Sequence, residues 1–296
     1  MSFFEKPLAY QTEWGTFSIR TLGDWEYRSE DNDNARFDTR QIVSELGFST
    51  QLKNDWNVGA KYIADYSSER RDEYLDEFRV FAQDQWGLAI AGDIATQVFD
   101  QTRRQETVGL LGIENDNFTL PLESYGVYYQ WSSPSLRLLI GLDEEANFEA
   151  GVVIDKPVGR FQYKLSLRVN QTEDEEGNAQ GVKESEGIAL MGQIKRGRWL
   201  IDVQLMAENV TSLQSERDFD LITVSSGLHY QFDRLKLSLS GVSRENVLDN
   251  TERTVALGAR FDLARGLSIN LGASVSDSEI LTEDFKTYAA SLRYEF

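Results

Sequence analysis

The sequence of 296 residues contains no cysteine and only one histidine. Without cysteine there is no disulfide framework, no thiolate metal site and no thiol nucleophile. The H-E-x-x-H pattern and the Cys/His patterns of zinc sites are absent as well. Proline is scarce, at four residues, and no run of about 18 apolar residues exists, so the sequence predicts no transmembrane helix.

Positive charge is also in short supply. Thirty Lys and Arg stand against 49 Asp and Glu, which gives a formal net charge of −19. This balance disfavours nucleic acid and anionic membrane surfaces as partners. The acids concentrate between the predicted strands, as in residues 24–38 and 173–176, where the simplest interpretation is solubility. The mean hydropathy of −0.43 looks soluble, but a transmembrane β-barrel gives a similar value because half of each strand faces a wet lumen.

What the sequence has instead is a period of two. In the last segment, apolar residues alternate with polar ones and the chain ends on an aromatic ring; the apolar set is Tyr288, Ala290, Leu292, Tyr294 and Phe296. Residues 161–170 alternate in the same way. Such alternation predicts strands with one apolar and one polar face. Sixteen segments of this kind follow one another along the chain.

The connections between these segments differ in length in a regular way. Seven short turns are predicted at residues 51–55, 84–85, 132–135, 156–159, 195–198, 233–234 and 264–266. Longer polar loops lie between them. Short turns on one side and long loops on the other are typical of bacterial outer-membrane barrels. An even strand count lets the last strand pair with the first, which removes the open edges that hydrocarbon does not tolerate.

Large aromatic residues gather at the short-turn ends of the predicted strands, as expected for a girdle at a membrane interface. The girdle set comprises Trp14, Trp56, Trp86, Trp131, Trp199, Phe232, Phe261 and Phe296. A soluble sandwich or propeller is the rival architecture. Its apolar faces would need a second layer, which sixteen strands with polar inner faces do not supply. We therefore predict an all-β fold: one domain, residues 1–296, forming a 16-stranded antiparallel transmembrane β-barrel.

Sixteen strands enclose an aqueous channel, and small residues predicted to face inward leave it room: Gly126, Gly141, Gly151, Gly227, Gly258 and Gly272. The connection at about residues 94–123 is the longest and carries much apolar content, so it should pack against something. In the fifth segment we expect Trp86, Leu88 and Ile90 to face outward. Gly87, Ala89 and Ala91 would then form a small-residue floor for this loop inside the barrel.

This combination resembles the general porins of Gram-negative outer membranes: sixteen strands, a terminal Phe296, and the run from Gly92 to Asp100 at the start of a long inward-folding third outer loop. The resemblance implies a homotrimer in a lipid bilayer with lipopolysaccharide. It also implies an eyelet where loop acids face wall bases. The acids are Asp93, Asp100, Glu106, Glu114 and Asp116; the bases are Arg20, Lys61, Arg79, Arg36 and Arg40. Arg103 and Arg104 depart from the pattern because they place positive charge on the loop.

The resemblance implies passive diffusion of ions and small hydrophilic solutes, filtered by size and by the field across the eyelet. Acidic outer loops should enrich cations at the mouth, so we expect mild cation selectivity. A channel selective for a sugar, peptide or organic ion is the alternative, although only Phe81 and Tyr128 are clearly inward aromatics. The location expected is the bacterial outer membrane. No signal peptide precedes the barrel, so an exported protein would be seen here in its mature form with an added Met.

Enzymatic and cofactor chemistry find less support in the sequence. The single histidine, His229, is predicted to be a pore-wall residue, since no neighbouring strand supplies an evident Ser-His-acid set. No glycosidase pair stands out among 49 carboxylates. We therefore expect no enzyme activity and no cofactor. The acidic runs at residues 31–34 and 173–177 offer oxygen ligands for Ca²⁺, with a solvated acidic loop as the simpler interpretation.

Overall fold

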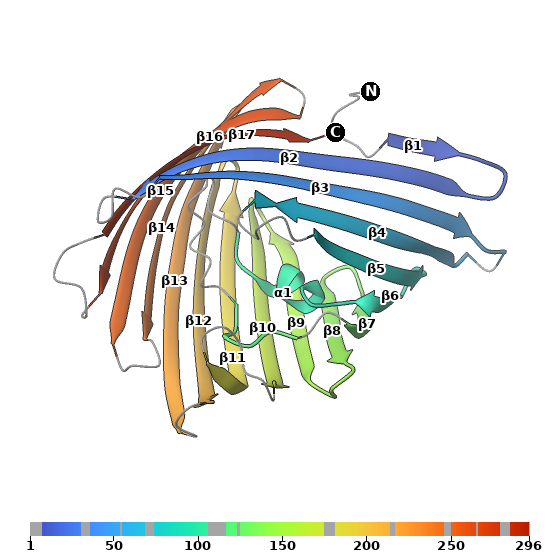
Figure 1. The fold of residues 1–296 in the computed structure, drawn as a ribbon. Helices are drawn as coiled ribbons and strands as arrows, with labels where there is room; N and C mark the ends of the chain where they lie inside the picture. Colours follow the sequence, from blue (N-terminus) through green and yellow to red (C-terminus); the bar gives the residue numbers. More distant parts are fainter. Residues whose placement is uncertain are drawn as a thin grey trace.

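A closed antiparallel β-barrel is what the computed structural model of the chain shows (Figure 1). It describes residues 8–30, 36–53, 55–68, 74–105, 117–122, 125–174, 181–213, 217–245, 250–264, 266–278 and 285–295. The strands are β1 (Leu8–Gln11), β2 (Thr16–Glu30), β3 (Arg36–Gln51), β4 (Asn57–Ser67), β5 (Tyr74–Gln83), β6 (Gly87–Asp93), β7 (Tyr125–Ser132), β8 (Leu136–Asp143), β9 (Phe148–Val158), β10 (Phe161–Glu173), β11 (Val182–Arg196), β12 (Trp199–Ser212), β13 (Asp218–Phe232), β14 (Leu235–Glu245), β15 (Thr251–Ala264), β16 (Leu267–Ser278) and β17 (Phe285–Glu295); the helix α1 (Gln97–Thr102) follows β6.

The barrel closes where its last strand meets its second. Strand β17 pairs antiparallel with β2, from Thr287 opposite Glu30 to Glu295 opposite Leu22. Each of β2 to β17 pairs with both neighbours around the ring, so these sixteen strands leave no open edge along the wall. The predicted closed 16-stranded antiparallel barrel is therefore confirmed.

Strand β1 is an addition that the sequence pattern did not predict. It pairs with the first residues of β2, from Leu8 opposite Ile19 to Gln11 opposite Thr16. It thus continues the same edge of β2 beyond the point where β17 stops. The hydroxyl of Thr12 organises the turn between the two strands, accepting hydrogen bonds from the backbone N–H groups of Trp14 and Gly15, both at 3.2 Å.

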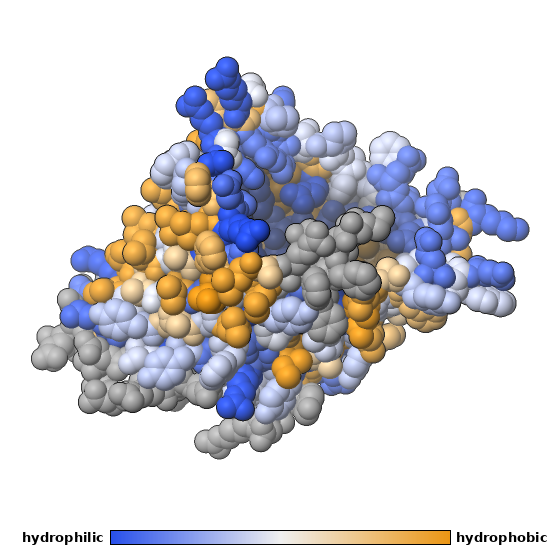
Figure 2. Space-filling model, turned by 90° about the horizontal axis from the view of Figure 1, so that it is seen from above, coloured by the Kyte–Doolittle hydropathy of each residue, from blue (hydrophilic) through white to orange (hydrophobic). Residues whose placement is uncertain are grey.

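The two faces of the wall differ as the alternation predicts. On β12, Ile201, Val203 and Leu205 are exposed on the outside, whereas Asp202 and Gln204 are buried on the inside. Figure 2 shows apolar residues gathered on the outer side of the wall and hydrophilic residues around the central hollow. An apolar exterior around a polar interior is the reverse of a soluble core and fits a wall that faces lipid.

All seven predicted short turns connect consecutive strands: β3 to β4, β5 to β6, β7 to β8, β9 to β10, β11 to β12, β13 to β14 and β15 to β16. Among the residues that the structure describes, no helix is long and apolar enough to cross a membrane.

The prediction of which residues of the fifth segment face outward was wrong. In β6, Ile90 is 8% exposed and lies opposite Phe81 and Tyr128, which point into the barrel. Ala89 and Ala91 face outward instead. Because β6 is apolar on both faces, its residue types do not reveal which face is inside. The larger residues point inward here because the loop that follows covers that part of the wall with apolar side chains.

Candidate functional site

The chain enters the lumen at the end of β6. Gly92 has a φ of +115°, a conformation that residues with a Cβ rarely adopt. A Cβ at this position would also stand 2.2 Å from the carbonyl oxygen of Phe78. This glycine lets the backbone leave the strand, and α1 then lies inside the ring of strands (Figure 1), in contact with β8, β9 and β10.

An apolar cluster fixes the start of the loop to the inner wall. Its buried members from the loop are Ile94, Val98 and Leu122, and its buried members from the strands are Ile90, Tyr128, Leu139 and Val153. Burial of such side chains contributes about 1.5–3 kcal/mol each. The cluster therefore anchors both ends of the loop, since Ile94 and Leu122 lie near its two boundaries.

Three inward glycines make room for these loop side chains. A Cβ at Gly126, Gly141 or Gly151 would stand within 3 Å of a loop side-chain atom, from Ile94, Leu122 and Thr102 respectively. We expected these glycines to widen the pore. They instead accommodate the loop, because only a residue without a Cβ lets another chain pack this close.

Polar contacts extend this attachment along α1. The hydroxyl of Ser166 donates to the carbonyl oxygen of Thr102, and the ammonium of Lys164 donates to that of Arg103 at 3.2 Å. The guanidinium of Arg137 donates to Gln101. Side chains from β10 thereby satisfy backbone carbonyl groups at the end of the helix, and β8 holds the helix through the side chain of Gln101.

A buried cluster of charged side chains lies directly after α1. Arg104 lies 3.4 Å from the carboxylate of Asp202, and the two side chains are 1% and 0% exposed. The Nε2 atom of His229 lies 3.0 Å from the other oxygen of the same carboxylate. One aspartate thus connects the loop with strands β12 and β13. Breaking such a buried pair costs far more than breaking a surface pair.

The second described part of the loop, residues 117–122, is held by β9 and β10. Arg168 donates to the side chain of Asn117 at 2.6 Å and to the carboxylate of Glu149 at 2.8 Å. Its guanidinium also lies 4.2 Å from the ring centroid of Phe118. That ring occupies the space left by Gly187, where a Cβ would stand 2.5 Å away.

Further contacts reach β11, β12 and β14. The backbone N–H and the hydroxyl of Thr119 donate to the two carboxylate oxygens of Glu208, at 2.6 and 3.1 Å. Arg244 donates to the same hydroxyl at 2.8 Å, and Ser185 donates to Glu208 at 3.1 Å. The carbonyl oxygen of Leu120 accepts hydrogen bonds from β10. The described loop residues therefore lie against the wall from β8 to β14.

The predicted loop acids have different surroundings. Asp93 is buried at the end of β6 and accepts a hydrogen bond from the backbone N–H of Ala95 at 3.2 Å. Asp100 is on α1, where it pairs with Arg103 at 3.2 Å. The other three, Glu106, Glu114 and Asp116, lie outside the described residues.

Three of the predicted wall bases lie on the inner face of β2, β4 and β5, and each has a carboxylate partner of its own. Arg20 pairs with Glu295, Lys61 with Glu45 at 2.8 Å, and Arg79 with Glu77 at 2.6 Å. Among the described residues, none of these three carboxylate partners belongs to the loop. The facing rows of loop acids and wall bases are therefore not seen as such among the described residues.

Arg40 does not belong to the pore wall. It lies opposite Trp25 in the β2–β3 register, and Trp25 is exposed on the outer face. The prediction was wrong because Arg40 has the same parity as Ile42 and Leu46, which also face outward. Arg36 shares that parity, but its side chain lies outside the described part of the structure.

Sequence reasoning missed the carboxylates of the inner wall that hold the loop. Asp202 and Glu208 contact the loop directly, and Glu149 pairs with Arg168, which contacts it. The signal was present: each of these carboxylates follows an apolar residue of the opposite face, namely Phe148, Ile201 and Ala207. We assigned negative charge to the loop and positive charge to the wall by resemblance. At one attaching contact the polarity is the opposite, with Arg104 on the loop and Asp202 on the wall. Wall bases such as Lys164 and Arg244 bind uncharged groups of the loop.

His229 is the one residue that suggested catalysis, and it lies inward as expected. In the β13–β14 register it stands opposite Ser238, so the wall carries serine, histidine and aspartate on three adjacent strands. However, the Nδ1 atom of His229 has no hydrogen-bond partner among the described residues. The base is therefore not joined to a serine hydroxyl, which a triad requires.

The predicted girdle residues lie near the short turns. Trp14 is in the β1–β2 turn, Trp56 and Trp86 directly precede β4 and β6, and Trp199 begins β12. Trp131, Phe232 and Phe261 lie in the last residues of β7, β13 and β15, and Phe296 is outside the described residues. Of the acidic runs proposed for Ca²⁺, residues 31–34 and 175–177 are also outside them.

Comparison with known proteins supports the fold. No protein-family model matches the sequence, and no curated protein matches it. Among solved structures, OmpT of Vibrio cholerae superposes with a TM-score of 0.74 at 12% identity, covering 98% of this chain and 100% of that one. The anion-selective porin of Comamonas acidovorans gives 0.74 at 11% identity (95% and 100%). The porin of Rhodopseudomonas blastica, as a triple mutant, gives 0.64 at 11% identity (95% and 100%). The chain therefore has the fold of outer-membrane porins.

Proposed function

We propose that this protein is an outer-membrane channel for passive diffusion of ions and small hydrophilic solutes. The observation that carries the proposal is the polar interior of a closed 16-stranded barrel with α1 and residues 117–122 attached to one side of it. A wall of this size encloses water. The attached loop narrows the lumen and makes the channel a sieve, while the paired charges of β2, β4 and β5 line the side that the described loop residues leave uncovered.

The selectivity we propose is a mild preference for cations. It is supported by the formal net charge of −19 and by the concentration of acids in the loops. Such a charge raises the cation concentration near the mouth, and salt screens the effect. The ion pairs along the inner wall, such as Lys61 with Glu45, contribute little net field because each base is balanced by a carboxylate close by.

A trimer is the assembly we propose, together with a location in the outer membrane. One of the similar structures is described as the trimer form of OmpT of Vibrio cholerae, with a TM-score of 0.75 at 12% identity. The apolar outer face is consistent with contact to lipid and to other protomers.

An enzyme is the competing function, because Ser238, His229 and Asp202 share one inner surface. The missing hydrogen bond at Nδ1 of His229 argues against it. Purified protein should therefore show no hydrolysis of phospholipid or nitrophenyl-ester substrates. Hydrolysis that disappears in Ser238→Ala would replace the channel proposal with an enzymatic one.

The deciding experiment is single-channel recording in a planar bilayer across a salt gradient. We expect large ohmic conductance, three-step closures and a reversal potential that indicates modest cation preference. Small conductance blocked by one class of solute would favour a substrate-selective channel. A reversal potential of the opposite sign would refute cation selectivity, and absence of conductance would refute the channel.

A further inference from the structure

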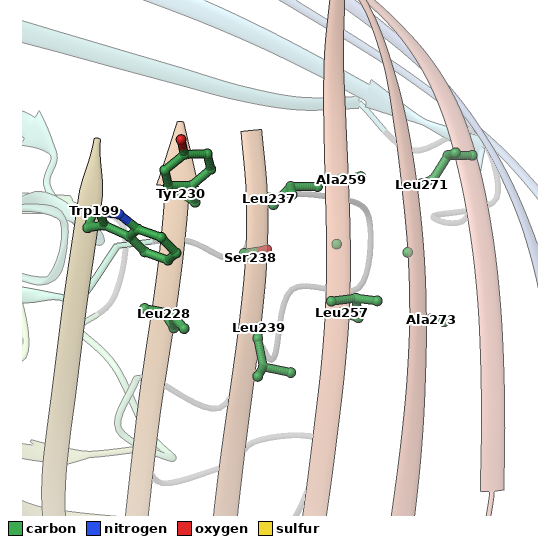
Figure 3. Close-up of a pocket in the computed structure, with 12 residues that line it drawn as sticks. Trp199, Leu228, Tyr230, Leu237, Ser238, Leu239, Leu257, Ala259, Leu271 and Ala273 are labelled. Carbon is green, nitrogen blue, oxygen red and sulfur yellow. The ribbon is translucent and has the colours of Figure 1, made fainter. Parts of the chain in front are cut away.

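The outer face of β12 to β16 contains an apolar groove (Figure 3). It has a volume of about 510 Å³, which lies within the range of about 300–1,000 Å³ typical of small-molecule sites. Its walls are large side chains from five strands, and the principal ones are Trp199, Tyr230, Leu237, Leu257 and Leu271.

The groove exists because small residues interrupt the row of large ones. Ala259 lies between Leu237 and Leu271 in the register, and Ala273 lies opposite Leu257. Where an alanine stands between two leucines, the outer surface is hollowed. The groove runs from the short-turn end of the wall, at Trp199 and Tyr230, toward its middle, at Ala273.

A polar hollow of about 550 Å³ continues the groove at the short-turn end. The two share Trp199, Tyr230 and Leu237. The hollow crosses the rim of the barrel. Arg198 and Asp233 line it at the turns, whereas Lys195, His229, Gln231 and Lys236 line it from the inner face, together with Gln105 of the loop. An apolar groove that ends beside the exposed guanidinium of Arg198 matches a molecule with an acyl chain and an anionic head.

Positive charge is concentrated here despite the strongly negative chain. Residues 196–198 and 233–234, at the two turns above the groove, contain three arginines and one acid, Asp233. Arg198 lies 3.4 Å from Asp233, but both side chains are more than half exposed. Such a pair is weak, so Arg198 remains able to bind an anion. Its guanidinium also lies 4.7 Å from the ring of Phe232.

A second outer groove provides an internal comparison. It has about 480 Å³ and is lined by residues of β5 to β8, including Ala82, Ala91 and Ile140. It is nearly as apolar and lies on strands that are likewise joined by short turns. Those turns, residues 84–86 and 133–135, contain no Lys or Arg. The two grooves therefore differ in the charge at their entrance rather than in their apolar character.

We propose that the groove over β12 to β16 binds an anionic phospholipid of the leaflet at the short-turn end. One acyl chain would lie along Trp199, Leu257 and Ala273. The phosphate would be bound by Arg198 and Arg234 at the turns, where Arg234 also donates to the carbonyl oxygen of Leu263 on β15. The inference rests on the proposed membrane location and not on the proposed conduction. Basic residues near a membrane surface attract anionic lipid in this way.

The test is native mass spectrometry of the full chain in detergent with phosphatidylglycerol or phosphatidylcholine of identical acyl chains. We expect preferential retention of phosphatidylglycerol. In the double variant Arg198→Gln, Arg234→Gln, retention of that lipid should fall by about 25-fold, since each of the two basic residues contributes a factor of about five. In Ala259→Phe, Ala273→Phe, which fills the groove, retention of both lipids should fall.

The matched control is Ala82→Phe, Ala91→Phe, which fills the groove without cations and should leave lipid retention unchanged. Folding of each variant is checked by heat modifiability, which compares the gel migration of heated and unheated samples. Conductance is checked by bilayer recording. Equal retention of the two lipids by the unmodified protein would overturn the proposal. An equal loss of lipid retention in the control variant would also overturn it. A change of oligomer mass in Ala259→Phe, Ala273→Phe without any loss of lipid would overturn it as well, because it would assign the groove to a second copy of the chain. Lipid preference without conductance would leave this proposal standing and remove the channel.

Discussion

At the scale of single residues, burial decides how much an aspartate–arginine pair contributes to the stability of the folded protein. Asp202 is fully buried and holds both Arg104 and His229, whereas Asp233 is exposed at a turn and pairs with Arg198. Both are aspartates paired with arginines at 3.4 Å. Their energetic roles differ because a buried charge that loses its partner cannot be solvated by water.

The substitution Asp202→Ala should therefore lower the free energy of unfolding by about 3–5 kcal/mol. The matched change Asp233→Ala should lower it by no more than about 1 kcal/mol. Urea unfolding in lipid vesicles, followed by tryptophan fluorescence, measures both. Equal effects would mean that Arg104 is not held through this carboxylate in the folded protein.

The inward glycines act at the same scale. In Gly151→Val, the new side chain would overlap Thr102 and Val98, because even a Cβ would stand 2.8 Å from the Cγ2 atom of Thr102. We expect destabilisation by about 1–3 kcal/mol and larger or noisier conductance as α1 is displaced. Gly192→Val is the control, since no atom lies within 4 Å of a Cβ there. Identical behaviour of the two variants would contradict the packing described for α1.

At the scale of elements, the question is whether α1 stays against the wall during conduction. The structure holds it by the apolar cluster around Val98 and by hydrogen bonds from Lys164 and Ser166. A helix of six residues has little stability of its own. Its position therefore depends on these contacts, and a covalent link tests that position directly.

The absence of native cysteine makes the link simple to introduce. In a Thr102→Ala background, which removes the Cγ2 atom that a Cβ at residue 151 would overlap, Val98→Cys, Gly151→Cys should form a disulfide on oxidation, because the Cγ1 atom of Val98 lies 3.3 Å from the Cβ position of residue 151. Conductance should be the same with the disulfide oxidised or reduced, since α1 already occupies this place. Each single cysteine variant serves as the control. A lower conductance in the oxidised form would indicate that α1 normally leaves the wall.

At the scale of the whole molecule, closure depends on β17 and not on β1. Strand β17 pairs with residues 22–30 of β2, and β1 pairs only with residues 16–19. A chain that begins at Thr12 should therefore fold into the barrel and conduct. A chain that ends at residue 284 should not, because β2 and β16 would each keep an unpaired edge. Heat-modified gel migration and bilayer recording distinguish the two, and failure of the first truncation to fold would give β1 a structural role.

The sequence by itself determined the barrel: its strands, its short turns, its outward apolar face and its closure follow from a period of two and from turn positions. That period is local and survives in each segment, as the exposed Ile201 and Val203 on either side of buried Asp202 illustrate. Strand β1 was not predicted, because four residues are too few to display a period of two.

Only the tertiary structure decided how the interior is used. The facing of β6, the outward position of Arg40 and the attachment of the loop through Asp202, Glu149 and Glu208 depend on which strand lies opposite which loop residue. Such contacts join residues far apart in the chain, as Arg104 and Asp202 show. Local alternation predicts which face of the wall a residue occupies. The side chain that it contacts on that face is fixed only when the barrel closes and the loop packs against its wall.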